Sequence, residues 1–181
     1  MPDQPQHRPV LAGRDIVQGP DIRLEPLPEG HLLHVMGAID AEELASRLAA
    51  AGLTASMLRP AGYRQWFIAG DHVLPAPQIA ALSSAILGKA YLSDQSHGRV
   101  RIGLSGARAA ELLTKGTAVD LHPSTFPEGH AAVTLFGHIS VQLTRTGAVS
   151  FELTVLRSFA QALYEELQEL AISLGASRKA A

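Results

Sequence analysis

The stretch DQSHGRVRIGLSGARAAELLTKG, residues 94–116, contains a predicted strand followed directly by a predicted helix. The fold depends on this succession of strand and helix. Within this stretch, VRIGLSG at residues 100–106 has the composition of a buried strand. The following ARAAELLTKG, residues 107–116, predicts a helix that ends at Gly116, because glycine favours helix C-termini. The same order of strand and helix recurs on both sides of this segment.

The first half of the chain predicts a similar succession of elements. Asp40 begins a helix, and Glu43 follows it at the spacing of a capping box. GAIDAEELA at residues 37–45 resembles SGARAAELL at residues 105–113, which is weak support for a duplication. The predicted elements of this half are strands at 21–27, 31–39 and 64–70, a turn at 54–63, and helices at 40–52 and 77–87.

The second half adds three strands and a long closing helix. Ser158 and Gln161 have capping-box spacing, and leucines recur on one face of the helix as far as Leu174. The predicted strands are at 130–137, 138–145 and 149–156, the last two joined as a hairpin.

We therefore predict an α+β fold made of two consecutive strand-helix-strand-strand-helix units, with a mostly antiparallel sheet and helices packed on one face. The two pseudo-repeats would span about 21–93 and 94–175 of a single domain. An extended N-terminal arm over 1–20 and a flexible tail over 176–181 would flank them.

Composition excludes several classes of protein. The 181 residues are 46% hydrophobic and 18% charged, with a net charge of −2, which gives no electrostatic footprint for nucleic acid. The absence of cysteine excludes disulfides, thiol nucleophiles and sulfur-ligated metals. No apolar run is long enough for a membrane span, and the N-terminus lacks the pattern of a secretory signal. We expect a cytoplasmic protein.

Arginine strongly outnumbers lysine. Of 15 basic residues only Lys89, Lys115 and Lys179 are lysines. Arginine is enriched at protein interfaces, where lysine is depleted, so this bias fits a surface largely covered by partners. A genome whose base composition favours arginine would produce the same bias.

Asp94, Ser96 and His97 offer the residue types of a hydrolytic triad, but neighbouring side chains of an extended segment point to opposite faces. We expect Asp94 and Ser96 to fix a bend by local hydrogen bonds. The strand that follows places Arg99 and Arg101 where they could bond a neighbouring chain. Asp94, Ser96, His97, Arg99 and Arg101 together are the predicted partner interface. A small hydrolase that uses His97 is a further hypothesis, the third beside the two functions given at the end of this section.

Other motifs do not assemble a site. The histidines at 122, 130 and 138 have no carboxylate in a ligand pattern, and we predict no metal. The turn GLSGAR lacks the G-x-G-x-x-G pattern, so tight packing is the expected role of Gly103 and Gly106 rather than phosphate binding. The aromatic residues Trp66, Phe67, Phe136 and Phe151 lie in apolar strands and are predicted core residues. We predict no catalytic, cofactor or metal residues in this chain.

Three segments together resemble the gamma subunits of heterotetrameric sarcosine oxidase. They are residues 94–129, DQSHGRVRIGLSGARAAELLTKGTAVDLHPSTFPEG, residues 134–147, TLFGHISVQLTRTG, and residues 151–163, FELTVLRSFAQAL. The resemblance covers roughly residues 64–165. It implies a fold similar to the N-terminal region of folate-binding aminomethyltransferases, whose "SH" strand and "SGxxA" helix start look like Ser96-His97 and Ser105-Gly106.

The resemblance also implies that this chain has no active site of its own. It implies a non-catalytic, structural subunit beside alpha, beta and delta subunits, which would carry FAD, FMN and NAD and pass the methyl carbon of sarcosine to tetrahydrofolate. Some relatives have cysteine after the Lys-Gly pair, where this chain has Thr117, so a thiol role is excluded there. A free-standing folate or one-carbon binding module is the alternative.

Overall fold

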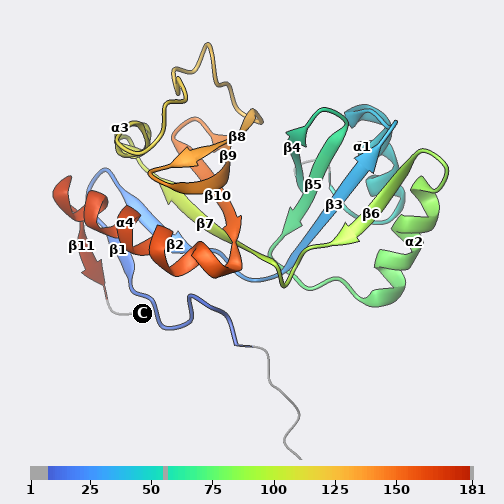
Figure 1. The fold of residues 1–181 in the computed structure, drawn as a ribbon, viewed down its shortest axis with the longest axis horizontal. Coiled ribbons are helices and arrows are strands. Elements are labelled where there is room, and N and C mark those ends of the chain that lie inside the picture. The colour runs from blue at the N-terminus through green and yellow to red at the C-terminus, as the bar shows by residue number, and fades with distance from the viewer. Residues whose placement is uncertain (1–7, 55–56, 180–181) are drawn as a thin grey trace, which may run out of the picture.

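The chain folds into two antiparallel sheets that lie side by side, with the helices on the outside (Figure 1). A computed structural model describes residues 8–54 and 57–179. Within those residues every strand pair is antiparallel. None of the helices found there is long and apolar enough to cross a membrane.

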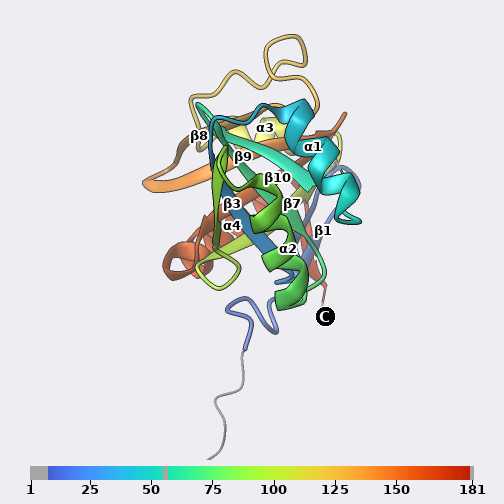
Figure 2. The ribbon, with the colours of Figure 1, turned by 90° about the vertical axis from the view of Figure 1, so that its right-hand side faces the viewer.

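The smaller sheet has four strands, and α1 and α2 cover its outer face (Figure 2). A cluster of aliphatic side chains joins the helices to the sheet, including Leu44 and Leu48 of α1, Leu82 of α2, and Leu33 and Val35 of β3. In spatial order the elements are β4 (Leu58–Gly62), β5 (Gln65–Gly70), β3 (His31–Gly37) and β6 (Ala90–Asp94), with α1 (Ala41–Ala50) and α2 (Ala76–Ile86).

The larger sheet has seven strands, and α3 and α4 pack on one of its faces. Leu112 of α3 and Leu163 and Leu167 of α4 share one buried cluster with Ile102 and Leu153 of the sheet. In spatial order the strands are β11 (Ser177–Lys179), β1 (Ile16–Gln18), β2 (Arg23–Pro26), β7 (Arg99–Ser105), β10 (Ser150–Leu156), β9 (Ile139–Gly147) and β8 (Ala131–Phe136). The helices are α3 (Ala109–Thr114) and α4 (Ala160–Ser173), the latter preceded by the 3-10 turn η2 (Arg157–Phe159).

The predicted α+β class and the two repeated units are confirmed. In the first unit the chain runs β3-α1-β4-β5-α2 and the strands lie in the order β3-β5-β4. In the second it runs β7-α3-β9-β10-α4, with β8 between α3 and β9, and the strands lie in the order β7-β10-β9. Each unit therefore has the same topology, and each sheet has its helices on one face.

Two strands of the smaller sheet differ from the prediction. Residues 58–62 form β4 rather than part of a turn, and residues 90–94 form β6, which was not predicted from the sequence. Pro60 and Gly62 resemble turn residues, but β4 lies at the edge of its sheet, where proline is tolerated because one side of the strand needs no ladder bond.

The ends of the chain also differ from the prediction. Ile16–Gln18 of the predicted arm forms β1, and Ser177–Lys179 of the predicted tail forms β11, which pairs with β1. Residues 1–7 and 180–181 lie outside the described residues.

The predicted cap at Ser158 is wrong: Arg157–Phe159 forms η2, and α4 begins without a side-chain cap. The cap of α1 is confirmed, since the backbone N–H of Glu43 donates to Asp40 Oδ1 at 2.8 Å.

Gly106 connects β7 to the turn before α3 and has the packing role expected for it. Its φ of +118° is strained for any residue with a Cβ, and a Cβ there would overlap the backbone carbonyl of Asp21. We expect Gly106→Ala to lower the free energy of unfolding by roughly 3 kcal/mol or more, since backbone strain and overlap add.

Gly129→Ala is the matched control for this prediction. Gly129 also has a positive φ, +81°, but no other atom lies within 4 Å of the position that a Cβ would take, so only about 1 kcal/mol of strain is expected. Urea denaturation of both variants measures the difference. Equal losses would contradict the packing role of Gly106.

Candidate functional site

A layer of polar side chains lies between the two sheets. Along β9 and β10, polar and apolar residues alternate, and in strands alternate residues face opposite sides. The apolar side faces α3 and α4, and the other side faces the smaller sheet. The buried polar residues of that side include Arg101, Gln142, Thr144, Glu152 and Thr154. The smaller sheet has a small apolar cluster of its own, formed by Leu32, Phe67 and Ala69.

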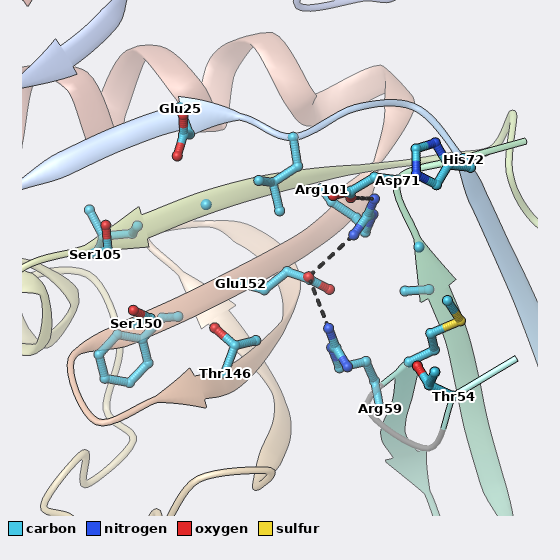
Figure 3. A pocket seen from close by; sticks show the side chains of 17 residues that line it. Glu25, Thr54, Arg59, Asp71, His72, Arg101, Ser105, Thr146, Ser150 and Glu152 are labelled. Carbon is cyan, nitrogen blue, oxygen red and sulfur yellow. Dashed lines mark hydrogen bonds and ion pairs between the residues drawn. The ribbon is translucent and has the colours of Figure 1, made fainter. Parts of the chain in front are cut away.

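Glu152 is the centre of this layer, and only 4% of it is exposed. Its Oε2 lies 3.4 Å from a guanidinium nitrogen of Arg101 and 3.4 Å from one of Arg59. Arg101, 7% exposed, also donates to Asp71 Oδ1 at 2.6 Å and to the carbonyl of Pro28 at 3.1 Å. One carboxylate on β10 thus connects β7 of its own sheet to β4 of the other (Figure 3).

A cavity of about 530 Å³ opens beside this cluster. Figure 3 shows Glu152 near its middle, with Arg101 and Asp71 on one side and Arg59 on the other. Its volume is within the range of small-molecule sites, which combine apolar walls with a few convergent polar groups. The remaining labelled lining residues are Glu25, Thr54, His72, Ser105, Thr146 and Ser150.

Two histidines of β3 lie in or beside the polar layer, His31 buried and His34 half-buried. Burial lowers the pKa of His31 below 6.5, and its Nδ1–H donates to the carbonyl of His72 at 2.7 Å. Nε2 of His31 is buried without a hydrogen-bond partner among the described residues. Burial likewise lowers the pKa of His34, which bonds Gln65 Oε1 at 3.0 Å and packs on Phe67 with ring centroids 4.6 Å apart.

The bend predicted at Asp94 and Ser96 is present. Asp94 Oδ1 accepts from the backbone N–H of Ser96 at 2.9 Å and from its hydroxyl at 2.5 Å. The same hydroxyl accepts from the N–H of Leu32 at 3.0 Å, which fixes the bend against β3. His97 and Asp94 are exposed. The Ser96 hydroxyl is therefore used in local structure rather than directed at His97 as in a triad.

The two arginines of the predicted interface lie between the sheets. Arg99 is half-buried, its guanidinium lies 5.1 Å from the centroid of the Phe67 ring, and burial lowers its pKa. Arg101 is the buried arginine that bonds Glu152 and Asp71. The five residues of the predicted interface are close in the sequence, but only Asp94, Ser96 and His97 lie at the exposed bend.

Of the other sequence candidates, Gly103 and Phe151 line the cavity. In the part of the chain that the structure describes, no three potential metal ligands cluster together. His122 bonds Ser124, and His130 packs against Phe126. Phe136 and Phe151 are core residues, as predicted. Gly103 lines the cavity, and a Cβ there would lie 3.0 Å from Leu27, a tight contact that fits the expected packing role.

Arg59, Asp71 and Glu152 were not predicted as site residues from the sequence. A signal for Glu152 is present in SFELTVL, residues 150–156, where a charged residue interrupts a strongly apolar strand. Its alternation predicts a polar face but cannot distinguish solvent from a second sheet. Arg59 was assigned to a turn and Asp71 follows a strand, and neither lies in a recognisable motif.

Comparison with known proteins identifies relatives of this arrangement. A family model described as the sarcosine oxidase gamma subunit family matches residues 79–173, just over half of the 181 residues. Heterotetrameric sarcosine oxidase from Corynebacterium sp. U-96 contains a chain with a TM-score of 0.76 and 23% identity. The alignment covers 96% of this chain and 99% of that one. No curated protein matches the sequence significantly.

Two further solved structures share the fold at lower similarity. Aminomethyltransferase T of the glycine cleavage system from Bartonella henselae has a TM-score of 0.56 and 17% identity, with 87% of this chain covering 47% of that one. The regulatory subunit of aspartate kinase from Thermus thermophilus has a TM-score of 0.50 and 14% identity, with 85% and 98% covered. At these identities the solved structures establish the fold alone.

The lowered pKa values of His31 and His34 predict a pH-dependent stability. Below pH 6.5 the unfolded chain binds protons on these rings, but the folded chain resists them because their folded-state pKa values are lowered. Stability is therefore complete above pH 6.5 and falls as the pH decreases, by up to about 1.4 kcal/mol per pH unit for each histidine.

Urea denaturation at about pH 7.5 and at about pH 5, on either side of the ordinary histidine pKa of about 6.5, measures this slope. The double variant His31→Gln, His34→Gln should flatten it. His138→Gln, a change at an exposed histidine, should leave the slope unchanged and serves as the control. An unaltered slope in the double variant would show that other groups cause the pH dependence.

Proposed function

Because this chain belongs to the sarcosine oxidase gamma subunit family, we propose that it is a non-catalytic, structural subunit of a heterotetrameric, flavin-dependent sarcosine oxidase. In this proposal alpha, beta and delta subunits are its partners. They carry FAD, FMN and NAD, oxidatively demethylate sarcosine, and transfer the carbon to tetrahydrofolate. Its location in the cytoplasm stays a prediction from the sequence.

The observation that carries the proposal is the agreement of family and fold. The family match begins within α2 and continues through the second unit, over residues 79–173. The fold similarity extends over 96% of this chain and 99% of a chain from a heterotetrameric enzyme. Coverage of both chains from end to end supports equivalence of whole subunits rather than of one shared motif.

Exposed apolar side chains on the edge strand β8 support a role in assembly. In the described residues β8 forms a ladder only with β9, and β4 of the smaller sheet lies near it without a ladder. Val133 is 64% exposed and Leu135 is 56% exposed. Exposed edges with apolar side chains favour association with another chain. Tyr63 and Tyr91 are also well exposed, and tyrosine is enriched in protein interfaces.

The bend at residues 94–97 stays part of the proposed interface. Asp94 and His97 are exposed there, and Ser96 holds the bend. Arg99 and Arg101 follow the bend in β7, and their guanidinium groups lie in the layer between the sheets. A partner that contacts the bend would therefore meet Asp94 and His97 first.

The alternative, a free-standing folate or one-carbon binding module, has one structural argument in its favour. The fold is similar to that of an aminomethyltransferase, and a cavity of about 530 Å³ lies between the two units. The chain spans about half of that enzyme's length, 47%, so its activity cannot be transferred to this chain by fold alone.

Expression of the full chain alone and with its neighbouring subunits distinguishes the two functions. We expect the isolated chain to show no flavin absorbance and no sarcosine oxidation, and to co-purify with the larger subunits when they are co-expressed. Calorimetry with tetrahydrofolate provides the second readout. Amine oxidation by the isolated chain would contradict the proposal, and folate binding without any co-purification would favour the module.

Charged substitutions on β8 test the proposed edge. We expect the double variant Val133→Lys, Leu135→Lys to reduce co-purification about tenfold or more, since a charge in a desolvated interface costs several kcal/mol. Both side chains are exposed, so the thermal midpoint of the isolated chain should change little.

Val73→Lys is the control for the β8 variant, because Val73 is similarly exposed but lies after β5 in the other sheet. Normal co-purification of the β8 variant would exclude this edge as a contact.

A further inference from the structure

The cavity between the sheets has the composition of a ligand site of its own. Its walls come from β7 and β10 of the larger sheet and from β5 and the start of β4 of the smaller sheet. At about 530 Å³ it is large enough for a small organic molecule. Because both units contribute to it, the position of its polar groups is fixed by the packing of the whole chain.

Glu152 points into this cavity with one carboxylate oxygen unsatisfied. Oε1 is buried and makes no hydrogen bond within the described part of the chain. Oε2 is bonded only at 3.4 Å to each of Arg59 and Arg101, whereas charge-assisted bonds are commonly about 2.7–2.9 Å long. Buried polar atoms in proteins are nearly always hydrogen-bonded, so Oε1 lacks a donor that a ligand could supply.

The charges around Glu152 restrict the kind of ligand. Arg59 and Arg101 are the cations of the lining, and Glu25, Asp71 and Glu152 are its carboxylates. A simple anion would meet the unsatisfied carboxylate oxygen, and a simple cation would meet two guanidinium groups. A molecule that carries one positive and one negative group close together can satisfy both kinds of neighbour.

We propose that this cavity binds a small zwitterion of the amino acid class. Its ammonium donates to Oε1 of Glu152, and its carboxylate lies toward the guanidinium groups of Arg59 and Arg101, which flank that glutamate (Figure 3). The remaining volume accommodates a side chain near the hydroxyls of Thr146 and Ser150. Glu25 is an unsuitable anchor, because both of its oxygens are bonded to Arg23, at 2.9 and 2.5 Å.

Titration of the isolated full chain, followed by amide NMR shifts, tests this ligand class. The probes are glycine and sarcosine as zwitterions, methylammonium and acetate as their separate halves, and tetrahydrofolate. We expect a zwitterion to bind about tenfold or more tightly than either half, with shifts near Glu152, since it gains a second charge-assisted contact. Equal binding of the halves, no zwitterion binding, or binding of tetrahydrofolate alone would overturn the proposal.

Three variants locate the site. Glu152→Gln should weaken zwitterion binding about tenfold or more through loss of the charged acceptor. Glu169→Gln changes an exposed carboxylate outside the lining and should leave binding unchanged. Thr146→Trp, a change at a lining residue away from the ion pairs of Glu152, should block the cavity without touching the charged cluster.

The thermal midpoint of each variant shows whether it folds, and Thr146→Trp keeps the proposal testable if Glu152→Gln unfolds. Unchanged binding in both Glu152→Gln and Thr146→Trp would overturn the assignment. The titration uses the chain without partners, so its failure leaves the proposed subunit role untouched.

Discussion

The fold depends on the pairing of one buried carboxylate across two sheets. Glu152 on β10 lies between Arg101 on β7 and Arg59 on β4, and a buried charge is tolerated only when opposite charges compensate it. The smaller sheet must therefore pack with β4 close to β10. Gln142 of β9 also donates to the carbonyl of Pro60, which adds a second polar contact between the two sheets. Together these bonds specify the relative position of units that apolar packing alone would leave less defined.

Much of the fold could be predicted from local patterns. The strand-to-helix segment at residues 100–116 and the leucine-rich helix at the end of the chain have periodicities that identify them directly, because buried faces repeat at fixed spacing. Ser158 shows the limit of such patterns. Its spacing fits a capping box, but the chain leaves β10 through a 3-10 turn that places Ser158 before the helix. The 3-10 turn after β10 therefore determines where α4 begins.

The candidate site could not be predicted, because it is formed by residues far apart in the sequence. Arg59, Asp71, Arg101 and Glu152 each come from a different segment, and they meet only after both sheets have formed. The sequence showed that one face of β10 is polar at Glu152 and Thr154, yet a polar face usually meets water. Whether it meets water or another sheet is a property of tertiary packing. The same holds for β11, whose three residues form a strand only because β1 is adjacent.

The position of the cavity couples ligand binding to the packing of the two units. Its charged lining residues, Arg59, Arg101 and Glu152, are also the residues that hold the sheets together. A ligand that supplies the missing donor to Glu152 binds only where these groups converge, so by mass action it stabilises the packed arrangement over any arrangement in which the sheets separate.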